Sequence, residues 1–558
     1  MRECLMGVET EYAISAVSRK GKSLNRHILV QTLLRVAREQ MPHIRDFGNG
    51  MFLQNGSRFY VDSGLHPEFA TPECGNPMEA ATHVAAGDAI LGKIIGALEN
   101  RFPQIEEVQL FRANVDYSGT ESSWGCHESY LTRLNPITIS AQIIPHLVSR
   151  VIYTGAGGFN PLAEGLAFSL SPRVAHLQRI LSDESTRNRG IFHDKNETLA
   201  REGCNRLHIL CGESLCSQVS SFLKIGTTAL VVAMIEEKAC PREAVQLSLP
   251  LSAIRAFSSD PGCTAAAALK NGKSATAIEI QSHYLRYAEA NLGRKFMPEW
   301  AESVCTEWRR ILNQLERNPG ALDTTLDWAV KHSLFRDQAR RRGVAWESLP
   351  HWNRVMNWLR GALTATEFHV MPVTAELVLG PNSPVKNERK MIAQYLADAG
   401  LNWAGFAGYI NLRRELFEID MRFSQLGGKG IFAALDRAGV LSHSRFGSRE
   451  IRSAMTRPPS FGRAGLRGEF VRRNAGQGGR LRCDWRGVWD IRRKRVLDLS
   501  DPFAAEEKWR DFTDLEAEWS REPGLAELRH LSRFRGIPES DPFQAEDPAY
   551  ISSPDIPF

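Results

Sequence analysis

Long hydrophobic runs are missing from this sequence. Its 558 residues contain no stretch of about 18 or more consecutive apolar residues, the length that a membrane-spanning helix needs. The first residues, Met1–Gly7, lack the apolar core of a signal peptide and lead directly into a charged segment. We therefore expect no membrane span and no secretion signal.

Closely paired cysteines are missing as well. The ten cysteines stand singly, without a Cys-x-x-Cys pair and without a spacing typical of a zinc site. Unpaired, reduced cysteines are the rule in the cytosol, so this pattern predicts a cytoplasmic protein.

Charge is spread unevenly along the chain. The net charge is only +5, but residues 445–495 hold 15 Lys or Arg against 4 Asp or Glu, while residues 504–558 hold 6 against 13. A basic segment can bind nucleic acid, nucleotide phosphates or an acidic protein. Nucleic acid is the least favoured of these partners, because the sequence lacks the stacking aromatic residues and the known nucleic-acid-binding folds.

A strand-like run with polar residues gives the first indication of function. Arg58, Tyr60 and Asp62 alternate with apolar residues, so on a strand they share one face. A Gly and a Pro then break the run, and Glu68 and Glu73 follow in a second extended piece. Taken alone, one such run is typical of an ordinary solvated sheet face.

A second alternating run near the N-terminus changes this interpretation. Residues 7–14 place Glu9 and Glu11 on one face of a strand. Carboxylates clustered on rigid strands suit a hard divalent cation such as Mg2+, because this ion takes oxygen ligands and keeps phosphate and water in its shell. The two runs together predict a magnesium site.

Two further strands carry histidines beside charged residues. His127 and Glu128 lead into a third carboxylate-bearing strand, which makes an acidic sheet face plausible. Arg206 and His208 share one face of a strand at residues 205–210. A guanidinium suits nucleotide phosphates and an imidazole suits a metal. The alternatives are a structural His–Glu pair and a salt-bridged strand face.

Helices and a separate C-terminal part account for the rest of the chain. An amphipathic helix is expected over residues 24–41, and another is expected to begin at Asn76 as its N-cap. We expect a catalytic domain over residues 1–440 with an insertion at about 367–401. A small C-terminal domain at 441–503 and an acidic, partly disordered tail at 504–558 should follow.

Seven motifs follow one another between about residues 5 and 240. They are Met6-Gly-Val-Glu-Thr-Glu-Tyr12, Asn55-Gly-Ser-Arg-Phe-Tyr-Val-Asp62, His66-Pro-Glu-Phe-Ala-Thr-Pro-Glu-Cys74, Asn114-Val-Asp116, Gly125-Cys-His-Glu-Ser-Tyr-Leu131, Arg206-Leu-His208 and Leu223-Lys-Ile-Gly-Thr-Thr-Ala-Leu230. With these motifs the chain resembles the Pup ligase and Pup deamidase/depupylase family, relatives of glutamine synthetase and gamma-glutamyl-cysteine ligase. Weaker similarity continues over most of residues 400–503.

The resemblance implies a fold and a reaction. The fold would be α+β, with a curved antiparallel sheet backed by helices and a small C-terminal domain, and with ATP and Mg2+ on the concave sheet face. The ligases of this family activate the C-terminal glutamate side chain of a small protein modifier, Pup, as a gamma-glutamyl phosphate. A lysine of a protein substrate then attacks this intermediate. The hydrolases of the family cleave the amide or isopeptide bond in a related site.

The resemblance also implies roles for individual residues. Asp62 would be the base that deprotonates the attacking lysine, which is otherwise a protonated ammonium at neutral pH. The metal would be held by Glu9 and Glu68, together with Glu11 or Tyr60. ATP would be bound by Arg58, Arg206, His208, Arg467 and Trp485. Further candidates are Glu73, His127 and Glu128.

Chain length favours a ligase over a hydrolase. The depupylases carry a long insertion between the first strand and the strand that bears the aspartate, and Tyr12–Asn55 leaves no room for it. Departures from the family pattern keep other hypotheses open. Arg112-Ala-Asn114 stands where the family has Lys-Asn-Asn, and Lys195 stands where the family has Arg. Lys cannot replace Arg where a planar guanidinium binds a carboxylate or a phosphate. The alternatives are a deamidase or depupylase, a ligase for another acid and amine, and a non-catalytic binding protein.

Overall fold

The computed structural model describes residues 4–20, 24–118, 122–183, 188–193, 203, 205–240, 243–362, 382–385, 387–476 and 479–513. Most of the predicted insertion, Lys195 and the tail beyond residue 513 lie outside these residues. The predicted domain limits at residues 440 and 503 stay a prediction.

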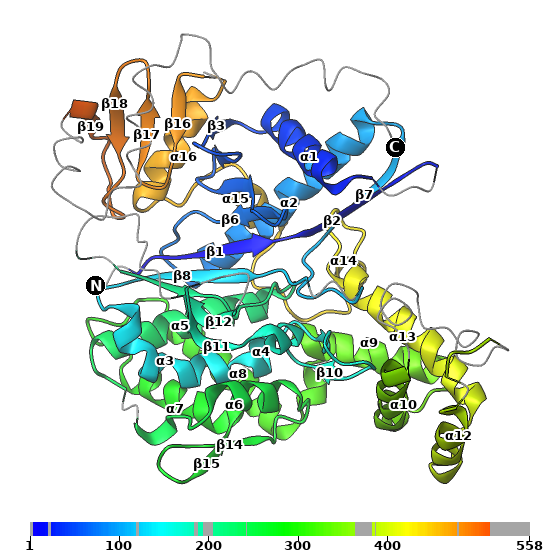
Figure 1. Ribbon diagram of the computed structural model, residues 1–558. Helices are drawn as coiled ribbons and strands as arrows, with labels where there is room; N and C mark the ends of the chain where they lie inside the picture. The colour runs from blue at the N-terminus through cyan, green and yellow to red at the C-terminus, as the bar shows by residue number, and fades with distance from the viewer. Residues whose placement is uncertain are drawn as a thin grey trace.

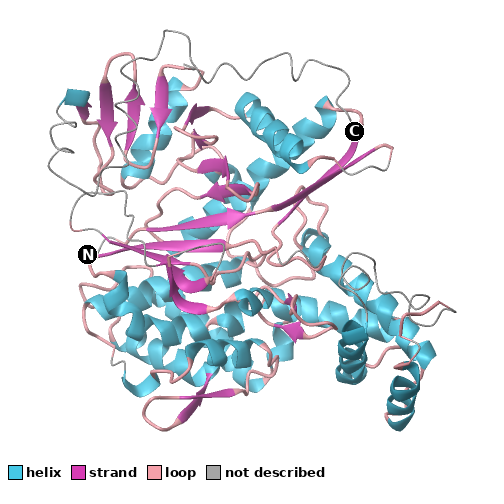
Figure 2. Ribbon diagram, viewed as in Figure 1, coloured by secondary structure: helices cyan, strands magenta, loops and turns pink. Residues whose placement is uncertain are grey.

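A nine-stranded sheet forms the centre of the molecule (Figures 1 and 2). Its strand order is β11-β12-β13-β8-β1-β6-β5-β4-β3, and all of these neighbours are antiparallel except β11 and β12. The strands are β1 (Met6–Glu11), β3 (His43–Arg45), β4 (Met51–Leu53), β5 (Arg58–Val61), β6 (Pro67–Ala70), β8 (Cys126–Thr132), β11 (Arg179–Ser182), β12 (Gly190–His193) and β13 (Asn205–Ile209). The predicted α+β fold with an antiparallel sheet is confirmed, apart from this one parallel pair at the edge.

Period-two alternation explains how the sheet is formed. Along β1 the apolar Met6 and Val8 are buried, while Glu9 and Glu11 are half-buried on the opposite face. The turn between β4 and β5 is an Asn-Gly turn, in which Gly56 has a φ of 81° that disfavours other residues. One face of the sheet therefore faces the core and the other carries polar side chains.

Helices cover the apolar face of the sheet. The elements at this face include α1 (Arg26–Gln40), α2 (Pro77–Arg101), α3 (Pro136–Ser149), α4 (Val151–Thr154) and α5 (Gln218–Glu236). Asn76 caps α2 as predicted, because its side chain accepts a hydrogen bond from the Glu79 backbone N–H at 2.8 Å.

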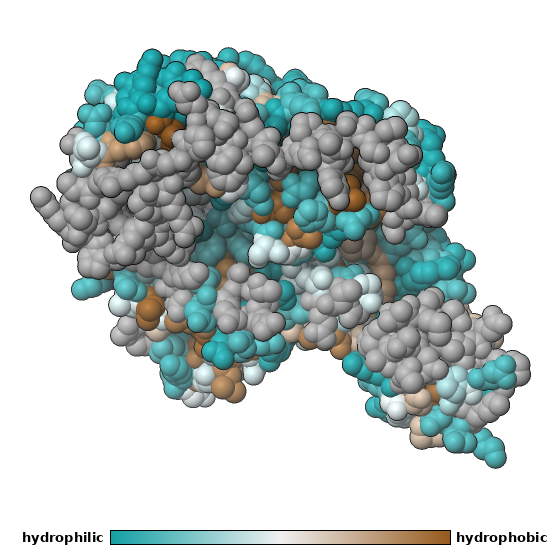
Figure 3. All heavy atoms as spheres, turned by 45° about the horizontal axis from the view of Figure 1, so that its top comes forward, coloured by the Kyte–Doolittle hydropathy of each residue, from teal (hydrophilic) through white to brown (hydrophobic). Residues whose placement is uncertain are grey.

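Two of these helices, α2 and α5, are long and apolar enough to cross a membrane by length and composition alone. Both are mostly buried inside the fold, as core helices are. On the face drawn in Figure 3, hydrophilic side chains predominate among the coloured residues, and the hydrophobic ones form only small groups. The apolar surface of α2 and α5 is thus taken up by the core.

The remaining elements surround this centre. The strands β2 (Ala13–Ser18) and β7 (Ile105–Phe111) form a ribbon of their own that continues from β1. Below and beside the sheet in Figure 1 lie helices and two short hairpins. They are α6 (Pro250–Ser258), α7 (Ala277–Ala290), α8 (Ala301–Arg317), α9 (Asp327–Arg341), α10 (Leu349–Ala362), α12 (Arg389–Asp398), α13 (Trp403–Phe423), α14 (Ile431–Arg437), β9 (Gly158–Phe159), β10 (Phe168–Ser169), β14 (Ala266–Ala268) and β15 (Ser274–Thr276).

A small C-terminal unit packs against the β3–β4 end of the sheet. It consists of α16 (Arg463–Asn474) and a sheet of β16 (Leu481–Cys483), β17 (Gly487–Asp490), β18 (Arg495–Asp498) and β19 (Trp509–Asp511). Ile44 and Phe52 of the large domain join its hydrophobic core. The preceding helix α15 (Ser448–Ala454) contacts α2 instead. The unit is therefore held to the sheet by shared apolar burial.

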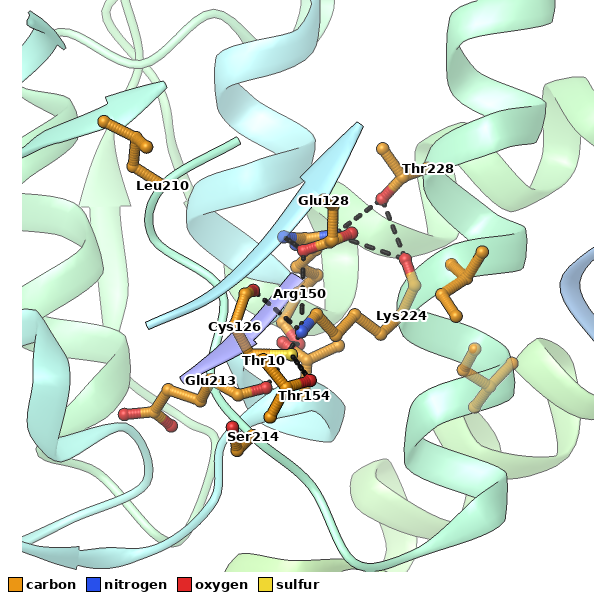
Figure 4. Close-up of polar contacts among 12 residues, drawn as sticks. Thr10, Cys126, Glu128, Arg150, Thr154, Leu210, Glu213, Ser214, Lys224 and Thr228 are labelled. Carbon is orange, nitrogen blue, oxygen red and sulfur yellow. Dashed lines mark hydrogen bonds and ion pairs between the residues drawn. The ribbon is translucent and has the colours of Figure 1, made fainter. Parts of the chain in front are cut away.

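Glu128 does not belong to the acidic face, which corrects its assignment as a site candidate. Its side chain points to the helical side of β8, where Arg150 donates to it at 2.6 and 2.9 Å and the Lys224 ammonium lies 3.8 Å away (Figure 4). All three side chains are at most 3% exposed. Neighbouring residues on a strand face opposite ways, so His127 and Glu128 cannot both reach the site.

Replacing Glu128 by Gln should lower the free energy of unfolding by about 3–5 kcal/mol, because it leaves two buried cations without their anion. Urea unfolding followed by circular dichroism measures this change. The control is Glu418→Gln, whose partner Arg422 lies 3.4 Å away with both side chains exposed, and it should change stability by about 0–1 kcal/mol. Equal losses in the two variants would contradict the role of the buried cluster.

Candidate active site

The register of β1 brings the predicted metal ligands together. Glu11 lies directly opposite Glu68 of β6, and Tyr60 of β5 lies opposite Glu68 on its other side. Glu9 lies between Ala70 of β6 and His127 of β8. Glu9, Glu11, Tyr60 and Glu68 therefore occupy one face of three adjacent strands, as the sequence predicts.

The electrostatics of this face favour a bound cation. Burial, followed by the charges of Glu9 and Glu11, raises the pKa of Glu68 well above its ordinary value. Burial also raises the pKa of Glu11. Both shifts mean that the ionised carboxylates are destabilised where they stand, and a bound cation would reverse this.

Two histidines extend the acidic face. His127 Nδ1 lies 4.0 Å from Glu9 Oε2, and the rings of His127 and His208 are 5.4 Å apart. Burial, followed by neighbouring cationic groups, lowers the pKa of both histidines well below the ordinary value, so they are neutral imidazoles. Glu9, His127 and His208 each present a ligand atom within 4.8 Å of the others, close enough to share one ion.

The predicted phosphate-binding arginines reach this face from two sides. Arg206 donates to Glu9 Oε1 at 3.0 Å and lies 3.0 Å from His208 Nδ1. Arg58 pairs with Asp46 at 2.5 Å and covers the Tyr60 ring at 4.1 Å. Asp46 thus orients Arg58, a role that sequence alternation does not reveal because Asp46 lies beyond β3.

A cavity of about 110 Å3 opens beside Glu9, between the sheet and the C-terminal unit. Glu9 and Arg206 lie at its polar side, and Trp485 of the C-terminal unit contributes an aromatic wall. The other lining residues are Leu5, Met6, Gly7, Val8, Ala70, Thr71, Glu73, Ser129, Tyr130, Leu131, Arg463 and Pro502. The position of Thr71 at the cavity was not predicted, although Thr71 belongs to the His66–Cys74 motif. Its hydroxyl accepts a hydrogen bond from the Val8 N–H at 3.0 Å.

Arg467 requires a correction, because it does not line the cavity. Its side chain is fully buried under Trp485, with the guanidinium 4.8 Å from the ring centroid, and it donates to Glu73 and to the Gly56 carbonyl. Arg463, one turn earlier on α16, lines the cavity and donates to Glu73 at 2.6 Å. Arg467 therefore packs against the Trp485 ring and holds it in place, without lining the cavity itself.

Glu73 is the link between the C-terminal unit and the sheet. Despite its burial, the charges of Arg467 and Arg463 lower its pKa from 4.5 to about 2. A depressed carboxyl pKa contributes stability that is fully present above pH 4.5 and is lost as the pH falls through about 2. Glu73 is thus ionised at neutral pH and fixes both arginines.

Asp62 stands at the edge of the acidic face, directly after β5. His66 donates to one of its carboxylate oxygens through the backbone N–H at 2.7 Å, and His66 Nδ1 lies 3.1 Å from the other. Although burial alone would raise it, these contacts and the Gly64 N–H leave the pKa of Asp62 below its ordinary value. Asp62 is therefore an ionised, half-buried carboxylate at neutral pH.

Comparisons with known proteins give the family and the relatives of this chain. The model of the Pup-ligase protein family matches residues 4–356 and 387–489. The Pup–protein ligases of Mycobacterium tuberculosis and Mycobacterium bovis are each 29% identical over 515 residues, covering 90% of this chain and 97% of theirs. That of Mycobacteroides abscessus is 28% identical over 513 residues, with the same coverage.

Two solved structures are similar over most of the chain. One is the complex between the prokaryotic ubiquitin-like protein Pup and its ligase PafA, with a TM-score of 0.69 and 24% identity over 98% of this chain and 97% of that one. The other is the Pup ligase PafA in complex with ADP, with a TM-score of 0.63 and 25% identity over 89% and 94% of the two chains.

An antiparallel sheet with a polar face, and a small C-terminal unit that walls a cavity beside that face, define the catalytic domain of a carboxylate–amine ligase. Within this class, the chain belongs to the Pup-ligase family.

Replacing Glu73 by Gln should weaken ADP binding by at least about tenfold, as is typical when a supporting partner behind a site is removed. The substitution removes the negative charge that holds Arg463 and Arg467 in place. Arg467 in turn packs against Trp485, which lines the cavity. Equilibrium titration with ADP measures the change. Glu469→Gln, which alters an exposed pair on the same helix, should bind ADP as the unaltered protein does, and equal affinity in all three proteins would refute the link.

Proposed function

We propose that this protein is an ATP-dependent ligase that joins the C-terminal glutamate of Pup, or of a Pup-like modifier, to lysine side chains of proteins. One observation carries the proposal. In a chain of the Pup-ligase family, an acidic sheet face with two histidines lies next to the ionised Asp62 and to a cavity that Trp485 lines. A cytoplasmic location belongs to the same proposal and is supported by the free thiols of all described cysteines.

The cavity beside Glu9 is the proposed nucleotide site. Trp485 offers a flat aromatic surface for the base, next to the apolar side chains of Leu5 and Leu131. Arg206 at the polar side and Arg58 across the face supply planar guanidinium groups for phosphate oxygens. The relative solved in complex with ADP supports nucleotide binding by this chain.

Mg2+ is the proposed cofactor, and the residues present fit it. Glu9, Glu11 and Glu68 would hold it, with the Tyr60 oxygen and the neutral His127 and His208 beside them. When bound, the ion would supply positive charge that offsets the phosphate and carboxylate charges. The raised pKa of Glu68, caused by burial and then by Glu9 and Glu11, supports a cation at this position.

The proposed reaction has two steps, phosphoryl transfer and then attack by lysine. In the first, the side-chain carboxylate of the modifier's C-terminal glutamate attacks the γ-phosphorus of ATP, and ADP leaves. In the second, the lysine nitrogen attacks the carbonyl carbon of the acyl phosphate, the new C–N bond forms and phosphate leaves. The lysine ammonium loses two protons on the way to the amide. Asp62 takes the first, because it is ionised and stands at the edge of the face, and the second leaves with the phosphate.

The hydrolase hypothesis has less support. Between Tyr12 and Asn55 the chain forms β2, α1, β3 and β4, and this short span supplies no long insertion of the kind expected in depupylases. A ligase for another acid is the second alternative, because Lys195 replaces an arginine of the family pattern. Lys195 lies outside the described residues, so the structure does not bear on this alternative.

Asp62→Asn should lower the rate of conjugate formation by about 100-fold or more, the usual contribution of a general base. The assay is incubation with Mg-ATP, Pup ending in glutamate and a lysine-bearing acceptor, followed by intact mass and ADP release. One ADP should form for each conjugate. The control Asp337→Asn changes an exposed aspartate of α9 and should keep the full rate. Cleavage of a preformed conjugate without ATP consumption would refute the ligase and favour the hydrolase.

A further inference from the structure

The turn between β5 and β6 places His66 against Asp62, and we infer that His66 is the positioning residue for Asp62 in transfer to lysine. Both carboxylate oxygens of Asp62 contact this one residue, Oδ1 through the backbone N–H at 2.7 Å and Oδ2 through ring Nδ1 at 3.1 Å. The inference rests on the proposed function, because it takes Asp62 as the acceptor of the lysine proton.

The surroundings of the ring define which nitrogen carries the proton. His66 Nδ1 lies 3.1 Å from Asp62 Oδ2 and 3.8 Å from Glu11 Oε2. The ionised Asp62 carboxylate only accepts hydrogen bonds, so Nδ1 must be the protonated nitrogen and must donate to Oδ2. His66 therefore holds Asp62 by two N–H donors that come from fixed positions, one on the backbone and one on the ring.

The turn itself leaves space for this contact. A Cβ at Gly64 would lie 2.9 Å from His66 Cε1 and 3.1 Å from Nδ1, so a side chain there would displace the ring. Leu65 has a φ of 59°, a left-handed conformation that costs about 1–2 kcal/mol outside glycine. The strain is accepted in a turn closed by the Asp62 N–H to His66 carbonyl hydrogen bond of 3.0 Å.

Two other elements hold the turn and the ring. Arg26 of α1 donates to the Gly64 carbonyl at 3.1 Å. The ring of the buried Trp124 meets the His66 ring edge to face, with centroids 5.7 Å apart and an interplanar angle of 61°. The imidazole thus contacts both the turn and an indole, which restricts the plane in which Nδ1 can donate.

This arrangement restricts how Asp62 can meet an amine. A carboxylate has about four lone-pair sites, and His66 uses two of them. The remaining sites are held in one orientation, whereas a freely rotating carboxylate would sample many. Proton transfer needs a hydrogen-bond approach of about 2.6–3.2 Å, so loss of the orientation should slow transfer to lysine and leave acyl phosphate formation unchanged.

The experiment separates the two steps by the choice of nucleophile. Purified full-length protein is incubated with Mg-ATP and Pup ending in glutamate, and with either a lysine-bearing acceptor or hydroxylamine. Hydroxylamine is uncharged at neutral pH and captures the acyl phosphate without a base. His66→Ala should lose about 10- to 100-fold in kcat for lysine transfer, with unchanged hydroxamate formation and an unchanged KM for ATP.

Matched variants distinguish positioning from loss of fold. His66→Asn keeps an N–H donor at the place of Nδ1 and should recover most of the lysine transfer. Gly64→Ala should reproduce part of the His66→Ala defect, because its methyl group displaces the ring. Ser63→Ala, in the same turn and exposed, should behave as the unaltered protein.

The outcomes separate this inference from the proposed function. Full lysine transfer by His66→Ala, or equal loss of lysine transfer and hydroxamate, overturns the inference alone. No hydroxamate with the unaltered protein overturns the proposed function and this inference with it. Selective loss of lysine transfer with recovery in His66→Asn supports both.

Discussion

Repulsion among carboxylates on β1 and β6 is the interaction on which the rest of the site depends. Glu11 and Glu68 are directly opposite each other, and Glu9 is close enough to raise the pKa of Glu68 further after burial has raised it. The sheet tolerates this repulsion because burial of its other, apolar face stabilises the strands. A slip of β1 by one residue would turn Glu9 and Glu11 into the core, so the core and the acidic face specify the same register.

Period two is also the reason why much of the site could be predicted from the sequence. Alternation assigns Glu9 with Glu11, and Arg58 with Tyr60, to shared faces, and the register then brings these faces together. The same rule explains the wrong prediction for Glu128. It stands next to His127 on one strand, and only one of two neighbours can face the site.

Contacts between distant parts of the chain could not be predicted in this way. Arg463 and Arg467 lie four residues apart, on the same side of α16, so helical spacing does not distinguish them. Only the packing of Arg467 between Phe52 of the sheet and Trp485 of the C-terminal unit distinguishes it from Arg463, which lines the cavity. Asp46 and Thr71 likewise gain their roles from partners on other strands. A family resemblance predicts the fold and the chemistry, whereas these contacts between residues far apart in the sequence are seen only in the structure.

The cavity takes its walls from both ends of the described chain, from Leu5–Glu9 on β1 and from Arg463–Pro502 in the C-terminal unit. This has a consequence during synthesis. Domains fold as they leave the ribosome, beginning at the N-terminus, so the acidic sheet face exists well before its aromatic wall. A nascent chain can form the sheet, but the proposed nucleotide site is complete only once Pro502 has emerged. If the cavity is that site, nucleotide binding by a newly made molecule reports that translation has passed this point.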